Sequence, residues 1–324
     1  MKLVFIGGAH RSGTTMLGSM LGAHRSCLCI PESQFKISAY EKMRRKKQDG
    51  TLRAVFAMIR NDVRFKFWGL NVGPDIPDDI SSYQELLLWL IRKYSEKAKK
   101  PKAAICVDHT PLNIRYADTL FHLFPDAKMI HLVRDGRAVS ASIMPLDWGP
   151  NTIDKAASSW TKKIQLGLKA ESSYGSERVK KVRYEDVVLD PEKTMKDICL
   201  FLDITYEPEM IQGSGFLVPA YTAKQHHLVG RGPVADRVEA WKNSLSRREI
   251  EIFESIAGQY LLQLGYAVHF GATARKITFL EKIIFMLKHR YRKRFANRFR
   301  RRRRVKAGVD HAAEVFEKKS HKKT

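Results

Sequence analysis

The chain opens with Leu3-Val4-Phe5-Ile6-Gly7-Gly8-Ala9-His10-Arg11-Ser12-Gly13-Thr14-Thr15, an apolar run followed by a glycine turn and a group of hydroxyl side chains beside an arginine. Apolar residues then recur at helical spacing, at Met16, Leu17, Met20 and Leu21. This pattern predicts a buried strand, a turn from Gly8 to Thr15 and an amphipathic helix. The backbone N–H groups of such a turn, together with the positive end of the helix dipole, bind an anion. The opening of the chain therefore predicts a phosphate cradle.

The turn departs from the P-loop pattern G-x-x-x-x-G-K-[ST] at one position. Gly8, Gly13 and Thr15 fit the pattern. Thr14 stands where the lysine belongs, and the cation of the turn is Arg11 instead. In a nucleoside triphosphatase that lysine binds the β- and γ-phosphates. Because the cation has moved, a terminal group smaller than a triphosphate is the better candidate, and a P-loop kinase is the lesser alternative.

A second strand and turn repeat this arrangement further along the chain. Lys128–Val133 predicts a buried strand, and Ala138–Met144 predicts a helix. Arg134 falls at the carboxyl end of the strand, and Ser142 follows eight positions later. Ligands of open α/β sheets bind at the carboxyl ends of the strands. Both motifs are therefore predicted to lie at the same edge of one sheet.

The loop Arg11-Ser12-Gly13-Thr14-Thr15 resembles the K/R-S-G-T-T loop with which sulfotransferases bind the 5′-phosphosulfate of their donor. The run from Gly7 to Thr15 looks most like the tyrosylprotein branch of that family and its bacterial relatives. The resemblance covers about residues 1–270 and implies an α/β, P-loop-like three-layer fold with a central parallel sheet flanked by helices. It also implies 3′-phosphoadenosine 5′-phosphosulfate as the donor and no metal.

The resemblance also assigns donor-binding roles residue by residue. The 5′-phosphosulfate group would be bound by Arg11, Ser12, Gly13, Thr14 and Thr15. Arg134 and Ser142 match the arginine and serine that bind the 3′-phosphate in the family. Tyr184 matches a tyrosine near the adenine, although a strand tyrosine packed on the core is an equally good interpretation.

A later segment, Trp241-Lys242-Asn243, resembles the loop that closes over the nucleotide in the family. Trp241 and Lys242 are therefore candidate nucleotide contacts. The arginine-lysine-glycine run that precedes this tryptophan in the family is absent here. Either Arg231 or Arg237 would take its place.

Glu32 is the candidate general base. It lies 21 positions after Arg11, an offset that matches the catalytic glutamate of the tyrosylprotein branch, and its segment Cys29–Ser33 is expected to pass over the sulfuryl group. A carboxylate within hydrogen-bond reach of a phenol or alcohol takes its proton as the new bond forms. An ordinary surface or helix-capping glutamate is the alternative.

Two positions near the expected chemistry depart from that branch. Gln34 stands where the branch has an arginine that helps the acceptor site, and His109 stands where it has a lysine. A histidine can still donate a hydrogen bond to the sulfuryl oxygens, so His109 remains a candidate catalytic residue beside Arg11 and Glu32. The first-choice acceptor is a protein or peptide tyrosine, and a glycan, lipid or small-molecule alcohol is the alternative.

Composition bounds the class of protein. A chain of 324 residues with 44% hydrophobic content can bury one sizeable α/β core. The four cysteines, at 27, 29, 106 and 199, form no metal-ligand pattern and fit reduced thiols in a cytosol. We expect no signal peptide and no membrane-spanning run, and, because Met1 stands directly before the first strand, no amino-terminal anchor of the kind that Golgi relatives carry. We expect a cytoplasmic or peripherally membrane-bound enzyme whose catalytic domain covers residues 1–270.

Most of the formal net charge of +24 lies near the end of the chain, because Arg275–Lys323 holds 19 Lys/Arg against 4 Asp/Glu, a net charge of +15. Within residues 275–304, apolar side chains repeat every three or four positions among the basic ones, at Ile277, Leu280, Ile284, Leu287, Tyr291, Phe295 and Phe299. This predicts a basic amphipathic helix, of the kind that lies in the surface of an anionic membrane. Docking of its apolar face on the enzyme's own core is the second interpretation, and a nucleic-acid-binding module is the least favoured. Residues 307–324 predict a disordered tail.

Overall fold

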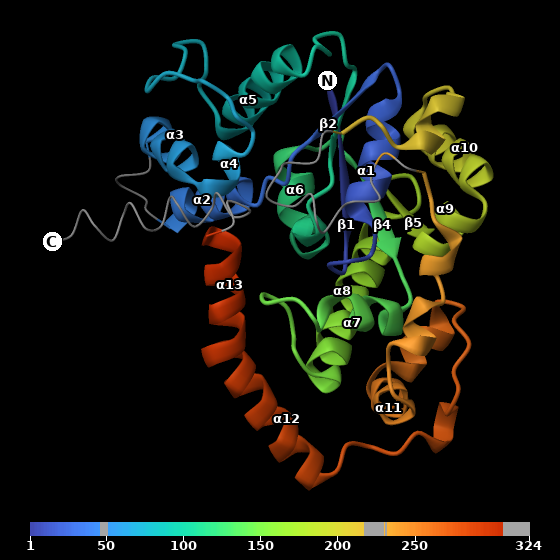
Figure 1. Cartoon of the computed structure of the whole chain (residues 1–324). Coiled ribbons are helices and arrows are strands. Elements are labelled where there is room, and N and C mark those ends of the chain that lie inside the picture. The colour runs from blue at the N-terminus through green and yellow to red at the C-terminus, as the bar shows by residue number, and fades with distance from the viewer. Residues whose placement is uncertain (46–50, 217–229, 231, 307–324) are drawn as a thin grey trace, which may run out of the picture.

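A parallel five-stranded sheet forms the centre of the molecule (Figure 1). The computed structural model describes residues 1–45, 51–216, 230 and 232–306. In spatial order the strands are β2 (Cys27–Ile30), β3 (Ile105–Asp108), β1 (Lys2–Gly8), β4 (Lys128–Val133) and β5 (Val179–Arg183). Every pairing between neighbours is parallel. The predicted α/β fold with a central parallel sheet flanked by helices is confirmed.

Alternation along the central strand β1 separates two hydrophobic cores. Leu3 and Phe5 point into one cluster of buried side chains, and Val4 and Ile6 point into another on the opposite face. Successive side chains of a strand point to opposite faces, so a strand that is apolar throughout requires cover on both sides. The sheet is therefore the middle layer of three.

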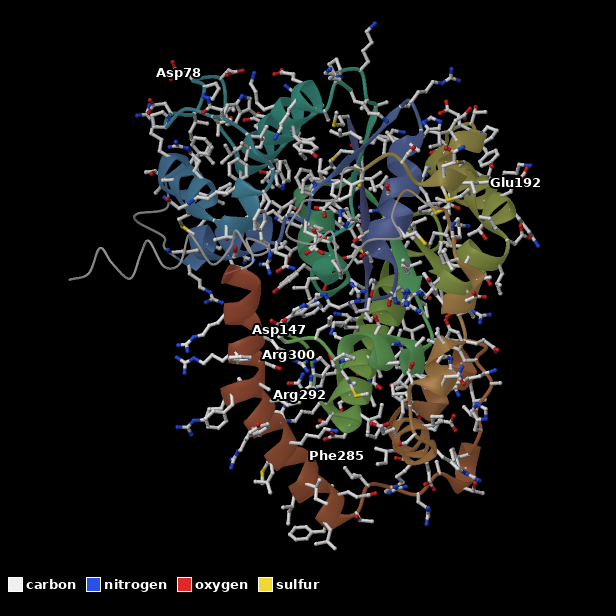
Figure 2. All side chains as sticks on the ribbon, in the orientation of Figure 1. Asp78, Asp147, Glu192, Phe285, Arg292 and Arg300 are labelled. Atoms are coloured by element: carbon white, nitrogen blue, oxygen red, sulfur yellow. The ribbon has the colours of Figure 1, made fainter. Side chains whose placement is uncertain are left out.

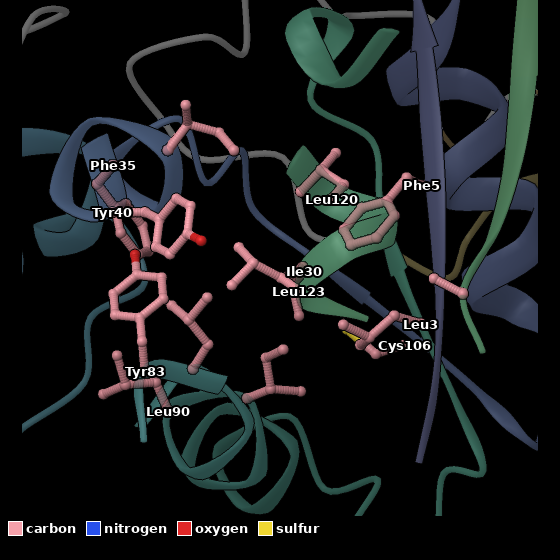
Figure 3. Close-up of a cluster of buried hydrophobic side chains, with 14 of the residues drawn as sticks. Leu3, Phe5, Ile30, Phe35, Tyr40, Tyr83, Leu90, Cys106, Leu120 and Leu123 are labelled. Carbon is pink, nitrogen blue, oxygen red and sulfur yellow. The ribbon is translucent and has the colours of Figure 1, made fainter. Parts of the chain in front are cut away.

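Helices cover both faces, as the first two residue clusters require. The face with Leu3 and Phe5 is covered by α2 (Phe35–Arg45), α3 (Leu52–Asn61), α4 (Val63–Lys66), α5 (Tyr83–Lys97), the 3₁₀ helix η1 (Pro111–Tyr116) and α6 (Ala117–Leu123), whose shared core is drawn in Figure 3. The opposite face is covered by α1 (Thr14–Ala23), α9 (Tyr184–Leu189) and α10 (Pro191–Leu202).

A third cluster of buried side chains lies beyond the carboxyl end of β4. It joins α7 (Gly136–Ile143), α8 (Ile153–Tyr174) and α11 (Arg247–Gln263) around Trp160 and Phe253. Short 3₁₀ turns connect these parts, at η2 (Pro208–Gln212), η4 (Ala235–Arg237), η5 (Ala240–Asn243) and η6 (Gly271–Thr273). The chain continues into α12 (Phe279–Tyr291), a π-helical segment (Arg292–Ala296) and α13 (Asn297–Lys306).

Local sequence signals explain where several of these elements begin. The spacing of Ser82 and Glu85 predicts a capping box at the start of α5, and the structure has it: the Ser82 hydroxyl accepts from the Glu85 N–H while the Glu85 carboxylate accepts from the Ser82 N–H. The Asp, Gly and Pro residues between Arg60 and Ser81 predict a loop there, but the stretch contains the single-turn helix α4, because the Asp62 side chain caps it by accepting from the Arg64 N–H. β2 was not predicted at all, since a run of only four residues is too short to show a strand period.

Candidate active site

The glycine turn between β1 and α1 has a tightly wound backbone. Arg11 has φ of 70° and Gly13 has φ of 96°, both in the left-handed region, and the Ser12 N–H donates to the Ala9 carbonyl at 3.2 Å. A Cβ at Gly13 would lie 2.6 Å from the Tyr184 ring, so only glycine fits there. The left-handed conformation of a non-glycine residue is costly and is typical of ligand-binding turns. Ser12, Thr14 and Thr15 are all buried at this end of α1.

Three arginines converge on this turn. Arg134, directly after β4, donates from Nη1 to the Arg11 carbonyl at 2.9 Å and from Nη2 to the Arg237 carbonyl at 3.1 Å. Its guanidinium lies over the Tyr184 ring, 4.2 Å from the centroid. Arg11 donates from Nε to the Ser142 hydroxyl at 3.1 Å. The sequence-predicted residues of the two strand-turn-helix motifs therefore form one cluster.

The electrostatics of the cluster favour an anion. Burial, followed by the positive charges of Arg134 and Arg237, lowers the pKa of Arg11. Two donors in the cluster, Ser12 Oγ and Arg134 Nε, are buried without a hydrogen-bond partner among the described residues. A buried donor that lacks a partner is costly, and a phosphate or sulfate oxygen would satisfy both. The residues present fit a doubly anionic donor at this edge of the sheet.

The backbone that carries Arg134 is fixed from several sides. The Trp160 indole donates to the Arg134 carbonyl at 3.1 Å. Asp135 caps α7, and its own N–H donates to the Glu185 carboxylate at 3.0 Å. These contacts come from α8 and α9, so the direction of the Arg134 side chain is set by elements distant in sequence.

Glu32 follows β2, which is the outermost strand at one end of the sheet. It is half-buried, and the Gln34 amide donates to its carboxylate at 3.2 Å. Burial raises the pKa of Glu32, the Asp108 carboxylate acts in the same direction, and the charge of Arg64 opposes them. A carboxylate with a raised pKa is a stronger base, which suits proton abstraction near neutral pH.

A buried ion pair next to Glu32 was missed by the sequence analysis. Lys36 donates from Nζ to Asp108 at 2.8 Å and to Asn113 at 2.7 Å, and Ser33 also donates to the Asp108 carboxylate. Lys36 and Asp108 are both buried. Burial alone would raise the pKa of Asp108, but Lys36 and the hydroxyl hydrogen bonds lower it to about 2. The one available signal was a lysine among the apolar residues that begin α2.

Arg64 in α4 is a second residue that the sequence analysis missed. Its charge acts on both Glu32 and His10 of the donor turn, while its side chain is exposed. The residue pattern of this stretch predicts a loop and gives no sign that a cation lies near Glu32. Gln34 replaces the arginine of the tyrosylprotein branch in sequence, and Arg64 supplies positive charge near Glu32 in space.

His109 is buried behind the donor turn. Its ring lies edge-on to Phe216, with centroids 4.9 Å apart, and its Cβ lies against Gly18 of α1. Burial lowers the pKa of His109 to about 4, despite the adjacent Asp108 carboxylate, so the ring is neutral at physiological pH. Both ring nitrogens lack a hydrogen-bond partner among the described residues. His109 can therefore act as a hydrogen-bond donor, and it does not add the charge that the family's lysine would.

The residues predicted to close over the nucleotide are divided in the structure. Arg237 lies in the arginine cluster through its carbonyl group and its charge. Trp241 is buried in the third hydrophobic cluster, 4.2 Å from the Arg137 guanidinium, and Lys242 forms an ion pair with Glu239 at 2.5 Å. Arg231 lies outside the described residues. Among the three described members of this group, Arg237 is the one that the structure brings to the glycine turn.

The fold and the site define an α/β protein whose glycine turn and clustered arginines are suited to phosphate-like groups. A family model described as "Sulfotransferase family" matches residues 4–208, and the chain belongs to this family of transferases. The predicted family and enzyme class are thereby confirmed. Membership implies the donor 3′-phosphoadenosine 5′-phosphosulfate and argues against the kinase and non-enzyme interpretations.

Curated relatives carry the name protein-tyrosine sulfotransferase. The chain is 28% identical to the Drosophila melanogaster protein over 67% of its own length and 41% of that protein, and 28% identical to the human protein-tyrosine sulfotransferase 1 over 65% and 54%. The chain thus spans about half the length of the curated relatives it matches. Two solved structures share the fold: sulfotransferase domains from the curacin biosynthetic pathway (TM-score 0.58, 21% identity, covering 83% of this chain and 99% of that one) and from the Synechococcus olefin synthase (0.59, 20%, 83% and 96%).

The described residues contain neither a membrane-spanning helix nor a metal-binding group of side chains. No helix there has the length and apolar character needed to cross a membrane. No group of three or more His, Cys, Asp or Glu side chains in the same residues could hold a metal ion. All four cysteines are buried free thiols.

Proposed function

We propose that this protein transfers the sulfuryl group of 3′-phosphoadenosine 5′-phosphosulfate to an acceptor hydroxyl, with a protein or peptide tyrosine as the first-choice acceptor. The observation that carries the proposal is the convergence of Arg11, Arg134 and the buried hydroxyl of Ser12 at one edge of the sheet. Family membership supports the donor. The names of the curated relatives support the tyrosine acceptor.

The donor would be bound at two anionic groups. The turn from Arg11 to Thr15 has the backbone N–H groups and hydroxyls for the 5′-phosphosulfate, and Arg134 with Ser142 has the donors for the 3′-phosphate. Tyr184 lies against both Gly13 and Arg134, and the adenine would lie near this side chain. When bound, the donor supplies an activated sulfuryl group. The arginines would stabilise the negative charge that spreads over its oxygens during transfer.

Glu32 would take the proton of the acceptor hydroxyl. The sulfur–oxygen bond to the acceptor forms while the bond to the donor phosphate breaks, and the acceptor proton passes to the Glu32 carboxylate. The raised pKa of Glu32 makes it a more effective base than an exposed glutamate. Gln34 holds the carboxylate in place through its amide. A neutral His109 would add a hydrogen-bond donor without charge.

The alternative acceptors are a glycan, a lipid or a small-molecule alcohol. Gln34 in place of the branch's arginine and neutral His109 in place of its lysine weaken the match to the tyrosylprotein branch. The charge of Arg64 near Glu32 favours an acidic acceptor such as a tyrosine among carboxylates. The general chemistry is the same for each acceptor, since each presents one hydroxyl to the same base.

Calorimetry with 3′-phosphoadenosine 5′-phosphate and with ATP tests the donor assignment. We expect tight binding of the former, weak binding of ATP, and a loss of at least about tenfold in affinity in Arg134→Ala, because a charged hydrogen bond to phosphate contributes roughly 1.5–3 kcal/mol. Arg92→Ala is the matched control, because Arg92 is an exposed arginine on α5. Preference for ATP, or equal affinity in both variants, would exclude the proposed donor.

Transfer of labelled sulfate tests the acceptor. The labelled donor is offered to an acidic peptide with one tyrosine, to the same peptide with phenylalanine, and to a panel of sugar, steroid and aliphatic alcohols. Label on the tyrosine peptide alone would support the first choice. Label on an alcohol and none on the peptide would reject tyrosine and keep the sulfotransferase assignment.

A further inference from the structure

The helical segment from Phe279 to Lys306 concentrates exposed apolar surface. Eight of the 13 large hydrophobic side chains exposed among the described residues belong to it: Phe279, Leu280, Ile284, Met286, Leu287, Tyr291, Phe295 and Phe299. Six of the eight, from Leu280 to Phe299, follow each other at spacings of three or four and form one row, called here the apolar row: Leu280, Ile284, Leu287, Tyr291, Phe295 and Phe299. Single exposed apolar residues are normal on a protein surface, whereas a contiguous row marks an interaction site.

The π-helical segment Arg292–Ala296 keeps the apolar row in line. Two successive steps of four residues, from Tyr291 to Phe295 to Phe299, would drift around a regular α-helix of 3.6 residues per turn. A π segment takes up an extra residue per turn, which cancels that drift. The rings of Tyr291 and Phe295 accordingly lie side by side, with centroids 5.7 Å apart.

A different edge of the helix fastens it to the catalytic domain. Glu281 pairs with Arg248 of α11 at 2.7 Å, and buried Asn297 donates to Asn151 at 2.9 Å. Arg292 and Arg300 both donate to the Pro145 carbonyl, at 3.4 and 2.9 Å. Figure 2 shows Phe285, Arg292 and Arg300 on the side of the helix that is turned toward the body of the molecule.

The apolar row is therefore not the docking surface of the helix. Its members are each between 56% and 71% exposed, while Phe285 is the helix residue that packs against the third hydrophobic cluster. Ile277, which the sequence analysis counts with the row, precedes the helix and also packs against that cluster. Docking of the apolar row on the enzyme's own core, one of the two main interpretations from the sequence, is thus absent in the described structure.

The charge of the helix distinguishes between the binding partners that could cover the apolar row: a second copy of the helix, nucleic acid or a lipid surface. Phe279–Lys306 contains 13 Lys/Arg and a single acidic residue, Glu281, which is already paired with Arg248. A second copy of the same helix would bring two strongly positive segments together, which is unfavourable. Nucleic acid would match the charge but would leave the apolar row in water. An anionic lipid surface matches both properties, because acyl chains take apolar side chains while phosphate headgroups take the cations.

We propose that the helix from Phe279 to Lys306 binds the protein to the surface of an anionic lipid bilayer, with the apolar row inserted at the boundary between headgroups and acyl chains. The fixed docking through Asn297 and Glu281 means that the whole catalytic domain would follow the helix to the surface. This inference is independent of the donor and acceptor proposals, since no residue of the helix belongs to the arginine cluster of Arg11, Arg134 and Arg237.

Vesicle sedimentation with the full chain tests the proposal. We expect binding to vesicles of phosphatidylcholine mixed with phosphatidylglycerol, and at least about tenfold weaker binding to phosphatidylcholine alone, because each cation near an anionic surface contributes about fivefold to partitioning. Binding should also fall as salt is raised. Equal binding to both kinds of vesicle would contradict the charged half of the proposal.

Matched triple variants test the apolar half. Leu280→Ser/Ile284→Ser/Leu287→Ser should lower the vesicle partition coefficient by at least about tenfold. The control, Leu189→Ser/Leu200→Ser/Leu262→Ser, removes three leucines of similar exposure (63, 78 and 59%) outside the helix and should change it less than about twofold. Unchanged binding by the helix variant would overturn the proposal, as would wild-type protein that ignores vesicles and binds duplex DNA. Unaltered affinity for 3′-phosphoadenosine 5′-phosphate in the helix variant would show that the catalytic domain is intact.

Discussion

Two regions at the carboxyl edge of the sheet, one after β4 and one after β2 and β3, each contain a pair of residues of like charge, Arg134 with Arg137 and Glu32 with Asp108. In each pair the two residues differ in the same way. After β4, Arg137 is buried between Asp135 and Glu254, whereas no described carboxylate pairs with Arg134. After β2 and β3, Asp108 is buried in an ion pair with Lys36, whereas Glu32 accepts a hydrogen bond from the Gln34 amide and forms no ion pair among the described residues. Each region thus combines a charged residue that is neutralised by an ion pair with a second one that forms no ion pair among the described residues.

The difference separates structural from chemical roles. A buried charge needs a partner of opposite sign, and once paired it is silent toward a ligand. Arg137 and Asp108 therefore stabilise the fold in the two regions. Arg134 and Glu32 have their charge available, the first for an anion and the second for a proton. Neighbouring residues of the same type can thus be assigned different roles from their partners alone.

Glu32→Gln should have the largest functional effect. We expect kcat to fall by roughly 10²- to 10⁴-fold, the range for removal of a general base, while affinity for 3′-phosphoadenosine 5′-phosphate stays the same. Initial rates with labelled donor and calorimetry measure the two quantities. Glu41→Gln, an exposed glutamate on α2, is the control. Turnover at the wild-type rate would remove Glu32 from the scheme and leave the acceptor edge without a base.

Arg137→Met should have the largest effect on stability. It leaves Asp135 and Glu254 buried without their cation, which costs about 3–5 kcal/mol when one partner of a buried pair is removed. Urea denaturation gives the free energy of unfolding. The exposed pair of Lys169 with Asp118 is the matched control, and Lys169→Met should cost at most about 1 kcal/mol. A loss of free energy of unfolding in Arg137→Met as small as that in Lys169→Met would contradict the distinction drawn between Arg137 and Arg134 from their ion-pair partners.

Sequence patterns were sufficient to predict the arginine cluster at the glycine turn because its signals are local. The strand, glycine turn and helix of Leu3–Leu21 lie within a few residues of each other, and Arg134 follows its strand directly. The region around Glu32 is built from segments that come together only when the chain folds. Lys36 and Asp108 are 72 positions apart, and α4 brings Arg64 near Glu32 from a predicted loop. Trp241 shows that a local resemblance can also fail to reveal where a side chain lies. Its segment resembles the nucleotide-closing loop of the family, yet the ring is buried against the Arg137 guanidinium.

Gln34→Leu should shift the pH dependence of the reaction. The hydrogen bond from Gln34 stabilises the charged form of Glu32, so its loss raises the pKa of that carboxyl further above its ordinary value. Because the base acts only when deprotonated, activity falls as the pH drops through this pKa. The acid limb of kcat should therefore move to higher pH by about one unit, which corresponds to roughly 1.4 kcal/mol. The rate at the plateau above the limb should change less than the rate on the limb. A limb that moves to lower pH would contradict the assignment of that limb to Glu32.

Arg134→Gln should have the smallest effect on stability. The variant loses two hydrogen bonds to carbonyl groups, but it also removes a positive charge that acts on Arg11 beside a third cation, Arg237. Relief of like-charge repulsion offsets the lost bonds, so we expect the free energy of unfolding without nucleotide to change by less than about 1 kcal/mol. The rise in melting temperature that 3′-phosphoadenosine 5′-phosphate gives the wild type should largely disappear, because stabilisation by a ligand follows its affinity. A loss of stability as large as that of Arg137→Met would show that Arg134 maintains the fold, and the contrast between the two arginines would then fail.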